Sequence, residues 1–286
     1  MKRLAILTIA AAALWAAGRG DTDNWKFEDR DTVQRTFDVA GGTGAPKLLV
    51  DNVFGYIHVT AAAGRQVRVT VQKHTIGRSA EAIAESKREV KLDISQQGNF
   101  VRLYEDGPFR SASGGTSYRC EEYYGYRVTY DFDVEAPPEI ELTLKSMNGG
   151  TIAVKGTTGD YQIHGFNGGI DMEDIAGSGS IRTFNGKLKV AYAKNPARAS
   201  DFKTFNGTMD VWFQAPLNAD LTMKSFNGGV WADFDVTPLP AQTSAQGGRI
   251  IYSSRNRTHE VRAGAGGPKL TFEGFNGAIK LHTKGQ

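Results

Sequence analysis

The chain has little of what most active sites need. It contains a single cysteine, Cys120, in 286 residues, so no internal disulfide can form. No G-x-S-x-G elbow, P-loop or complete G-x-G-x-x-G motif occurs in it. The histidines are few and lack the spacing of paired metal ligands: His58, His74, His164, His259 and His282. We therefore predict no catalytic residue, no metal site and no cofactor.

Only one long apolar run is present, and it lies in the first 18 residues. Lys2 and Arg3 precede the run Leu4–Leu14, and the small residues Ala16, Ala17 and Gly18 follow Trp15, which is the pattern of a signal peptide. The run is shorter than the roughly 20 residues that span a bilayer. We therefore expect a soluble, exported protein in the periplasm, on the cell surface or outside the cell, with no transmembrane segment after cleavage at residues 1–18.

A large charge excess is also absent. Loss of Lys2 and Arg3 with the signal peptide lowers the formal net charge from +3 to +1. Proteins that bind nucleic acid without sequence preference need a clear basic excess, so the mature chain is not expected to do so.

What the sequence has instead is a repeat built on Asn-Gly. The dipeptide occurs six times, usually as Phe-Asn-Gly, with steps of 19, 18, 21, 21 and then 49 residues between the asparagines: Asn148, Asn167, Asn185, Asn206, Asn227 and Asn276. A period near 20 residues is typical of stacked coils in which each unit covers its neighbour. The repeats predict an all-β fold, a right-handed single-stranded β-solenoid over residues 136–286.

Side chains alternate with period two on both sides of each Asn-Gly, as in β-strands. The positions predicted to face the core are Leu142, Leu144, Tyr161, Ile163, Ile170, Met172, Leu188, Val190, Phe202, Met209, Val211, Leu221, Met223, Ile279 and Leu281. Asn-Gly tolerates positive φ at both corner positions, which allows a sharp bend. Stacked corners would also place the six asparagines in a hydrogen-bonded ladder.

Two further columns accompany the asparagines. The residue before each asparagine is Met147, Phe166, Phe184, Phe205, Phe226 or Phe275. We expect these side chains to fill a corner of the core, because large exposed aromatic rows are rare on soluble proteins. The residue three before each asparagine is expected to point outward: Lys145, His164, Arg182, Lys203 and Lys224, with Glu273 in the last repeat.

This outward column is the main candidate binding site. Basic groups in successive coils could bind an extended polyanion, such as an acidic polysaccharide or another anionic envelope component. The alternative is a solvated surface whose charge is offset by acids such as Asp171 and Asp210.

The region before the repeats, residues 19–135, is also β-rich. Ser79 can cap a short helix over residues 79–90, inserted between strands. Residues 105–125 are polar and predict a long loop. Its aromatic and basic side chains suit contact with a sugar or a protein: Tyr118, Arg119, Tyr123, Tyr124 and Arg127. The alternative is a loop that covers strand edges. Pro46-Lys-Leu resembles Pro268-Lys-Leu, so one stack can begin near residue 46.

The signal peptide, the strands with one helix, and the repeated apolar-x-apolar-basic-small-Phe-Asn-Gly pattern resemble a bacterial putative-adhesin domain family of unknown function. The resemblance covers about Leu48 to Leu281 and implies an exported, non-enzymatic β-solenoid, with no catalytic residues to carry over. The loop at 105–125 and the 49-residue step depart from its pattern. Two other classes remain open: a polysaccharide lyase or hydrolase built on a β-helix, and an envelope assembly or stress factor that binds a protein partner.

Overall fold

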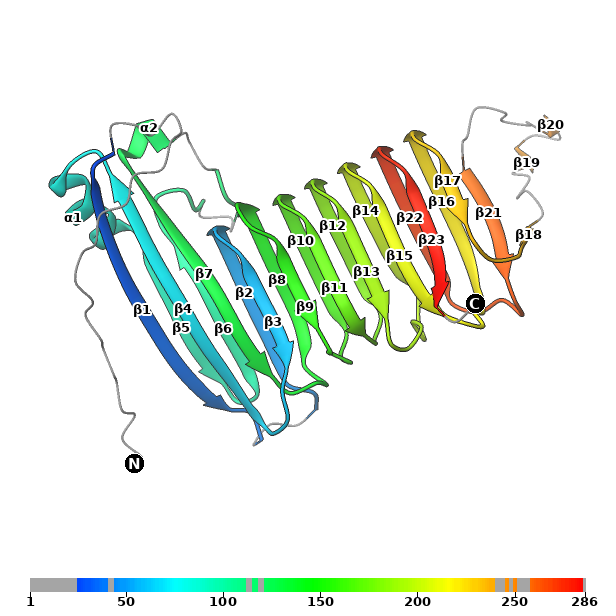
Figure 1. The fold of residues 1–286 in the computed structure, drawn as a ribbon, viewed down its shortest axis with the longest axis horizontal. Helices are drawn as coiled ribbons and strands as arrows, with labels where there is room; N and C mark the ends of the chain where they lie inside the picture. Colours follow the sequence, from blue (N-terminus) through cyan, green and yellow to red (C-terminus); the bar gives the residue numbers. More distant parts are fainter. Residues whose placement is uncertain are drawn as a thin grey trace.

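The computed structural model of the protein describes residues 25–40, 44–111, 115–117, 121–239, 245–246, 249–250 and 258–284. Over these residues the protein is all-β, with two large sheets that face each other and two short helices at one end (Figure 1). The all-β prediction is therefore confirmed. The predicted signal peptide, Tyr118, Arg119 and Cys120 lie outside the described residues.

The first sheet, sheet A, has ten strands. In spatial order they are β1 (Phe27–Asp38), β4 (Gln66–Gly77), β7 (Tyr126–Ala136), β3 (Ile57–Ala61), β9 (Ile152–Lys155), β11 (Ile170–Ile175), β13 (Leu188–Tyr192), β15 (Met209–Gln214), β23 (Ile279–Lys284) and β17 (Val230–Ala232). The strands from β3 to β17 are parallel, whereas β4 is antiparallel to both β1 and β7.

The second sheet, sheet B, has eleven strands. In spatial order they are β18 (Val236–Pro238), β21 (Thr258–Ala263), β16 (Ala219–Asn227), β22 (Lys269–Asn276), β14 (Ser200–Asn206), β12 (Gly179–Asn185), β10 (Tyr161–Asn167), β8 (Glu141–Asn148), β2 (Lys47–Phe54), β6 (Phe100–Asp106) and β5 (Lys91–Gln97). It is parallel from β16 to β6 and antiparallel at both ends. β19 (Ala245–Gln246) and β20 (Arg249–Ile250) form a separate pair.

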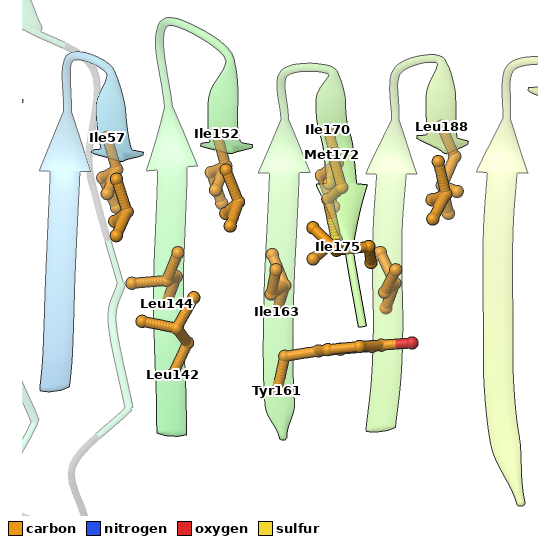
Figure 2. Packing of buried hydrophobic residues seen from close by; sticks show 14 of the residues in the cluster. Ile57, Leu142, Leu144, Ile152, Tyr161, Ile163, Ile170, Met172, Ile175 and Leu188 are labelled. Carbon is orange, nitrogen blue, oxygen red and sulfur yellow. The ribbon is translucent and has the colours of Figure 1, made fainter. Parts of the chain in front are cut away.

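Each Asn-Gly repeat supplies one strand to sheet B and the next strand to sheet A, with the corner between them. The pairing keeps equivalent positions level, so that Asn167 lies opposite both Asn148 and Asn185. Side chains that alternate inward from both sheets meet in one core, as Figure 2 shows for Leu144, Ile163 and Ile170. All fifteen positions predicted to face the core are buried.

The order of the last repeats differs from the sequence order. β22 lies between β14 and β16, so Asn276 sits between Asn206 and Asn227 and does not follow Asn227 at the end of the column. β16 then pairs on its other side with the antiparallel strand β21. The 49-residue step therefore reflects a strand order in which β21 precedes β22 in the sequence but lies on the outer side of β16 in the sheet.

The corners require glycine for two reasons, and positive φ is the predicted one: Gly149, Gly168, Gly207 and Gly277 have φ between +131° and +159°. Among the described residues, Asp174 is the only residue other than glycine with positive φ, so the corner asparagines keep ordinary backbone angles. A Cβ on Gly186 would lie 2.1 Å from the carbonyl oxygen of Gly168, and one on Gly207 would lie 2.0 Å from that of Gly186. Close approach of neighbouring coils excludes a side chain at these corners.

The predicted helix is present as α1 (Ala80–Glu89). The side chain of Ser79 accepts a hydrogen bond from the backbone N–H of Ala82 at 3.2 Å, which is an N-cap. α1 packs against β1, β4 and β7 at the wide end of the molecule. A second helical turn, α2 (Glu121–Tyr124), lies within the predicted loop.

Candidate functional site: the outward face of sheet B

The six asparagines form a continuous ladder along one edge of sheet B. Each side-chain amide donates from Nδ2 to Oδ1 of the next asparagine toward β8, at 2.7–2.9 Å, in the order Asn227, Asn276, Asn206, Asn185, Asn167 and Asn148. The bonds all run in one direction. The ladder explains why asparagine recurs at a position whose backbone angles do not demand it.

The residue two before the asparagine turns into the corner and is small. The hydroxyl of Thr183 donates to the carbonyl of Gly168 at 3.0 Å, and that of Thr204 donates to the carbonyl of Gly186 at 3.2 Å. Both bonds connect neighbouring coils. The small residue and the glycine in the motif therefore act together at the corner.

The phenylalanines lie on the outside, so the prediction that they fill the core is wrong. They are between 36% and 55% exposed: Phe166, Phe184, Phe205, Phe275 and Phe226. Neighbouring rings are nearly parallel, with centroids 4.5–5.0 Å apart. Each interior ring therefore covers its faces with its neighbours and presents an edge to solvent. We call these five residues the phenylalanine column.

This stacking sets the chemistry of the column. An aromatic ring has a negative face and a positive edge. Because the faces are covered, the exposed atoms are ring hydrogens with partial positive charge. Such an edge favours apolar groups or anionic oxygens over a ligand that must stack on an open ring face.

Two residues back along each strand lies the cationic column: Lys145, His164, Arg182, Lys203 and Lys224. All five side chains are exposed on the outward face of sheet B. The insertion of β22 places Glu273 between Lys203 and Lys224, and Glu273 Oε2 accepts from Lys203 Nζ at 2.8 Å. The sequence spacing predicts five consecutive basic groups, but Glu273 interrupts the row between Lys203 and Lys224.

The column has a fixed electrostatic pattern. Partial burial of the ring, followed by the nearby charges of Arg182 and Lys145, lowers the pKa of His164 below its usual value, so this imidazole is mainly neutral at pH 7. The hydrogen bond from Lys203 is the main cause of a lowered pKa at Glu273, which keeps that carboxylate ionised. Lys145 and Arg182 are thus cations on either side of a neutral histidine.

A third row completes the face, two residues further from the corner. It carries hydroxyl and amide groups with one acid: Thr143, Gln162, Ser180, Asp201, Thr271 and Thr222. We call the three rows together the recognition face. The rows lie about 7 Å apart along each strand, and positions within a row lie about 4.8 Å apart.

The β2 end of this face is closed by residues of the predicted loop. The Nη2 atom of Arg110 lies 2.9 Å from Oδ1 of Asp51, and both side chains are largely buried. Asp51 occupies the same row as Lys145, whose Nζ is 3.8 Å from Oδ2 of Asp51. The guanidinium of Arg110 also lies over the ring of Tyr104 at 4.5 Å. The loop therefore covers the continuation of the cationic column.

Sequence reasoning missed Glu105, which is fully buried at this end. Its Oε2 accepts from the backbone N–H of Val53 at 2.6 Å, and its Oε1 has no hydrogen-bond partner. Burial raises the pKa of Glu105 to about 8. On β2 the position opposite Asn148 is Phe54, whose side chain has no amide group to extend the ladder. At this end the carboxylate of Glu105 accepts a hydrogen bond from the backbone N–H of Val53.

The other predicted loop residues lie on different elements. Tyr123 is 60% exposed on α2. Tyr124 follows it there, with ring centroids 5.1 Å apart, and Arg127 lies on β7. Their role in contacting a sugar or a protein stays a prediction.

The outward face of sheet A carries ion pairs of the same kind as that between Lys203 and Glu273. Lys155 pairs with Glu173 at 3.0 Å and Lys189 with Asp171 at 3.4 Å across neighbouring strands. The alternative interpretation expects Asp171 and Asp210 to offset the charge of the cationic column, but both acids belong to sheet A. Within the described part of the chain, no three His, Cys, Asp or Glu side chains are placed to hold a metal ion. The same residues include no helix with the length and hydropathy to cross a membrane.

No family model and no curated protein matches the chain. Among solved structures, it is similar to a putative cell adhesion protein from Clostridium sporogenes, with 11% identity over 90% of this chain and 100% of the other and a TM-score of 0.43. A putative adhesin from Bacteroides fragilis gives 11% identity over 88% and 96%, with a TM-score of 0.37. A putative lipid binding protein from Parabacteroides distasonis gives 9% over 89% and 97%, with a TM-score of 0.27. Likeness at this level assigns no function to the chain.

Proposed function

We propose that the protein is an exported, non-enzymatic, adhesin-like binding protein whose recognition face holds an acidic polysaccharide. The scaffold in this proposal is a right-handed β-solenoid, continuous from about residue 46 and preceded by a signal peptide. The in-register pairing of β2 with β8 and of β3 with β9 supports one stack across the boundary at residue 135.

The observation that carries the proposal is the combination of two columns on one face. One row carries the cations Lys145, Arg182, Lys203 and Lys224, with a neutral His164 and the acid Glu273 among them, and the edges of stacked phenylalanines line the next row. The cations and the ring edges favour negative charge, and the interior rings provide no open face for a neutral sugar. The face is wide, flat and built on paired strands, which suits an extended polymer better than a small molecule.

The test is the binding of polygalacturonate, measured by calorimetry at low and high salt. The variant Lys145→Ala/Arg182→Ala/Lys203→Ala removes three cations from the recognition face. The control Lys155→Ala/Lys189→Ala/Lys280→Ala removes the same charge from sheet A. Exposed ion pairs contribute about 0.2–1 kcal/mol each, so the loss of three is expected to weaken binding by about 3- to 160-fold.

The control variant is expected to bind as the wild type does, and salt is expected to weaken wild-type binding. Equal losses in both variants would show attraction by net charge alone. Binding that neither variant changes would reject the recognition face as the site.

A further inference from the structure

We infer that the recognition face is a bounded site of four subsites, one per coil, in which a linear polyuronate lies along the stack and across the strands. This inference rests on the proposed function, because it specifies how the same face is filled. The subsites lie on the coils of β8, β10, β12 and β14. An acidic side chain of the protein marks each end of the site.

The direction of the ligand follows from where the cations are. Along any one strand the outward side chains include a single position of the cationic column, as in Ser180, Arg182 and Phe184 of β12. Across the strands, Lys145, Arg182 and Lys203 share one row. A polymer that lay along a strand would meet one cation, whereas a polymer that crosses the strands meets several.

The spacing of the row suits a sugar acid. Adjacent strands lie about 4.8 Å apart, and the repeat of an extended uronate chain is close to this length. A carboxylate of the chain can then lie near Lys145, Arg182 or Lys203, whereas the neutral His164 supplies no charge to its subsite at pH 7. The sugar hydroxyls face the polar row, which offers Thr143, Gln162 and Ser180 at the first three coils and Asp201 at the fourth.

One end of the site is closed by Asp51 and Arg110. The next position of the row beyond Lys145 is an acid already paired with a buried arginine at 2.9 Å. A carboxylate from the ligand has no free cation to meet there. The side chain of Asp51 is 13% exposed and that of Arg110 is 6% exposed, so the loop also blocks contact with this position.

Glu273 closes the other end. It occupies the row position after Lys203 and binds Lys203 at 2.8 Å. A ligand carboxylate on this coil would face a fixed negative charge. Lys224 lies one coil beyond Glu273, so it is separated from the other cations by this acid. Four coils thus remain between the two acids.

The experiment measures the affinity of galacturonate oligomers of two to eight residues for the wild-type protein and for Glu273→Gln. In the wild type we expect affinity to rise up to the tetramer and then to stay constant. In Glu273→Gln the acid is removed and Lys203 is released, so we expect severalfold tighter binding and a plateau that moves to the hexamer. The control is Glu173→Gln, which removes a paired acid from the outward face of sheet A.

A plateau at the same length in both proteins, or affinity that rises without a plateau, would overturn the four-subsite arrangement. Neither result would contradict the proposed function, which fails if the triple cation variant on the recognition face binds polygalacturonate as the wild type does, or no more weakly than the sheet A control does. Neutral malto-oligosaccharides serve as the probe for stacking. Binding of these as tight as that of the uronates would overturn the inference that ring edges and cations select the ligand.

Discussion

Replacement of Asn185 by alanine tests whether the asparagine ladder holds the coils together. The side chain stands inside the ladder: its Nδ2 donates to Asn167 at 2.7 Å, and its Oδ1 accepts from Asn206 at 2.7 Å. Asn185→Ala removes both bonds and leaves an acceptor on one neighbour and a donor on the other without a partner. Asn227 is the matched control, because it donates one ladder bond, to Asn276, at an exposed end.

The expected loss follows from the bonds and their burial. A hydrogen bond contributes about 0.5–1.5 kcal/mol net, and a buried polar group left unpaired costs about 1–3 kcal/mol. The amides beside Asn185 are partly buried, so solvent restores only part of their bonding. We expect Asn185→Ala to lower the free energy of unfolding by about 2–3 kcal/mol and Asn227→Ala by about 1 kcal/mol or less.

Urea unfolding followed by tryptophan fluorescence measures both changes. Hydrogen exchange at the backbone amides of β12 and β14 shows whether the loss is local, because each coil of a stack contacts mainly its neighbours. Equal and small losses in both variants would refute the reasoning, since the ladder would then exchange bonds with water at no net gain.

Three other outcomes are expected. Gly186→Ala should destabilise the protein by about 2 kcal/mol or more in the same urea assay, because the new Cβ would lie 2.1 Å from a carbonyl oxygen. Gly169→Ala should cost far less, because its Cβ would have its nearest contact at 3.4 Å. Similar losses in the two variants would contradict the argument that close approach excludes a side chain at the corner. Because the pKa of Glu105 rises from 4.5 to about 8 on folding, the free energy of unfolding of the wild type should fall as the pH rises from 4.5 to 8, by at most about 5 kcal/mol. A Glu105→Gln variant whose urea midpoint still falls over this pH range would assign the effect to another group. Because the pKa of His164 is lowered, binding of dextran sulfate should strengthen only as the pH falls below about 6.5 and His164 gains a proton, and His164→Gln should lose this gain; an unchanged pH profile in that variant would place the titrating group elsewhere.

Much of the fold follows from period-two alternation and the repeat spacing. Leu142, Ile163 and Met209 are buried as predicted, because a strand with one covered face cannot shift by one residue without exposing its apolar side chains. The spacing of the asparagines likewise predicts their common level in the sheet, since equivalent positions of stacked coils pair with one another.

The position of the phenylalanines shows where general expectation misled. Lys145 and Met147, like Arg182 and Phe184, are two residues apart on one strand, so alternation alone places both on the outward face. We expected burial because exposed aromatic rows are rare. Stacking reduces the apolar surface that such a row exposes to water, because each interior ring buries its faces against its neighbours.

Two features had no local signal in the sequence. The place of β22 between β14 and β16 depends on the path of the chain after Asn227, which spacing does not encode. The one hint was Glu273, whose charge complements Lys203 on the neighbouring coil. The burial of Glu105 depends equally on a contact between β6 and β2 that only the pairing of these strands reveals.

A crystal structure of the protein with a bound galacturonate tetramer tests the central claim most directly. The account predicts a sugar chain that crosses β8, β10, β12 and β14, with carboxylates within hydrogen-bond distance of Lys145 and Arg182 and with no sugar over Glu273. A chain that runs parallel to one strand, or that lies on the outward face of sheet A, would contradict it.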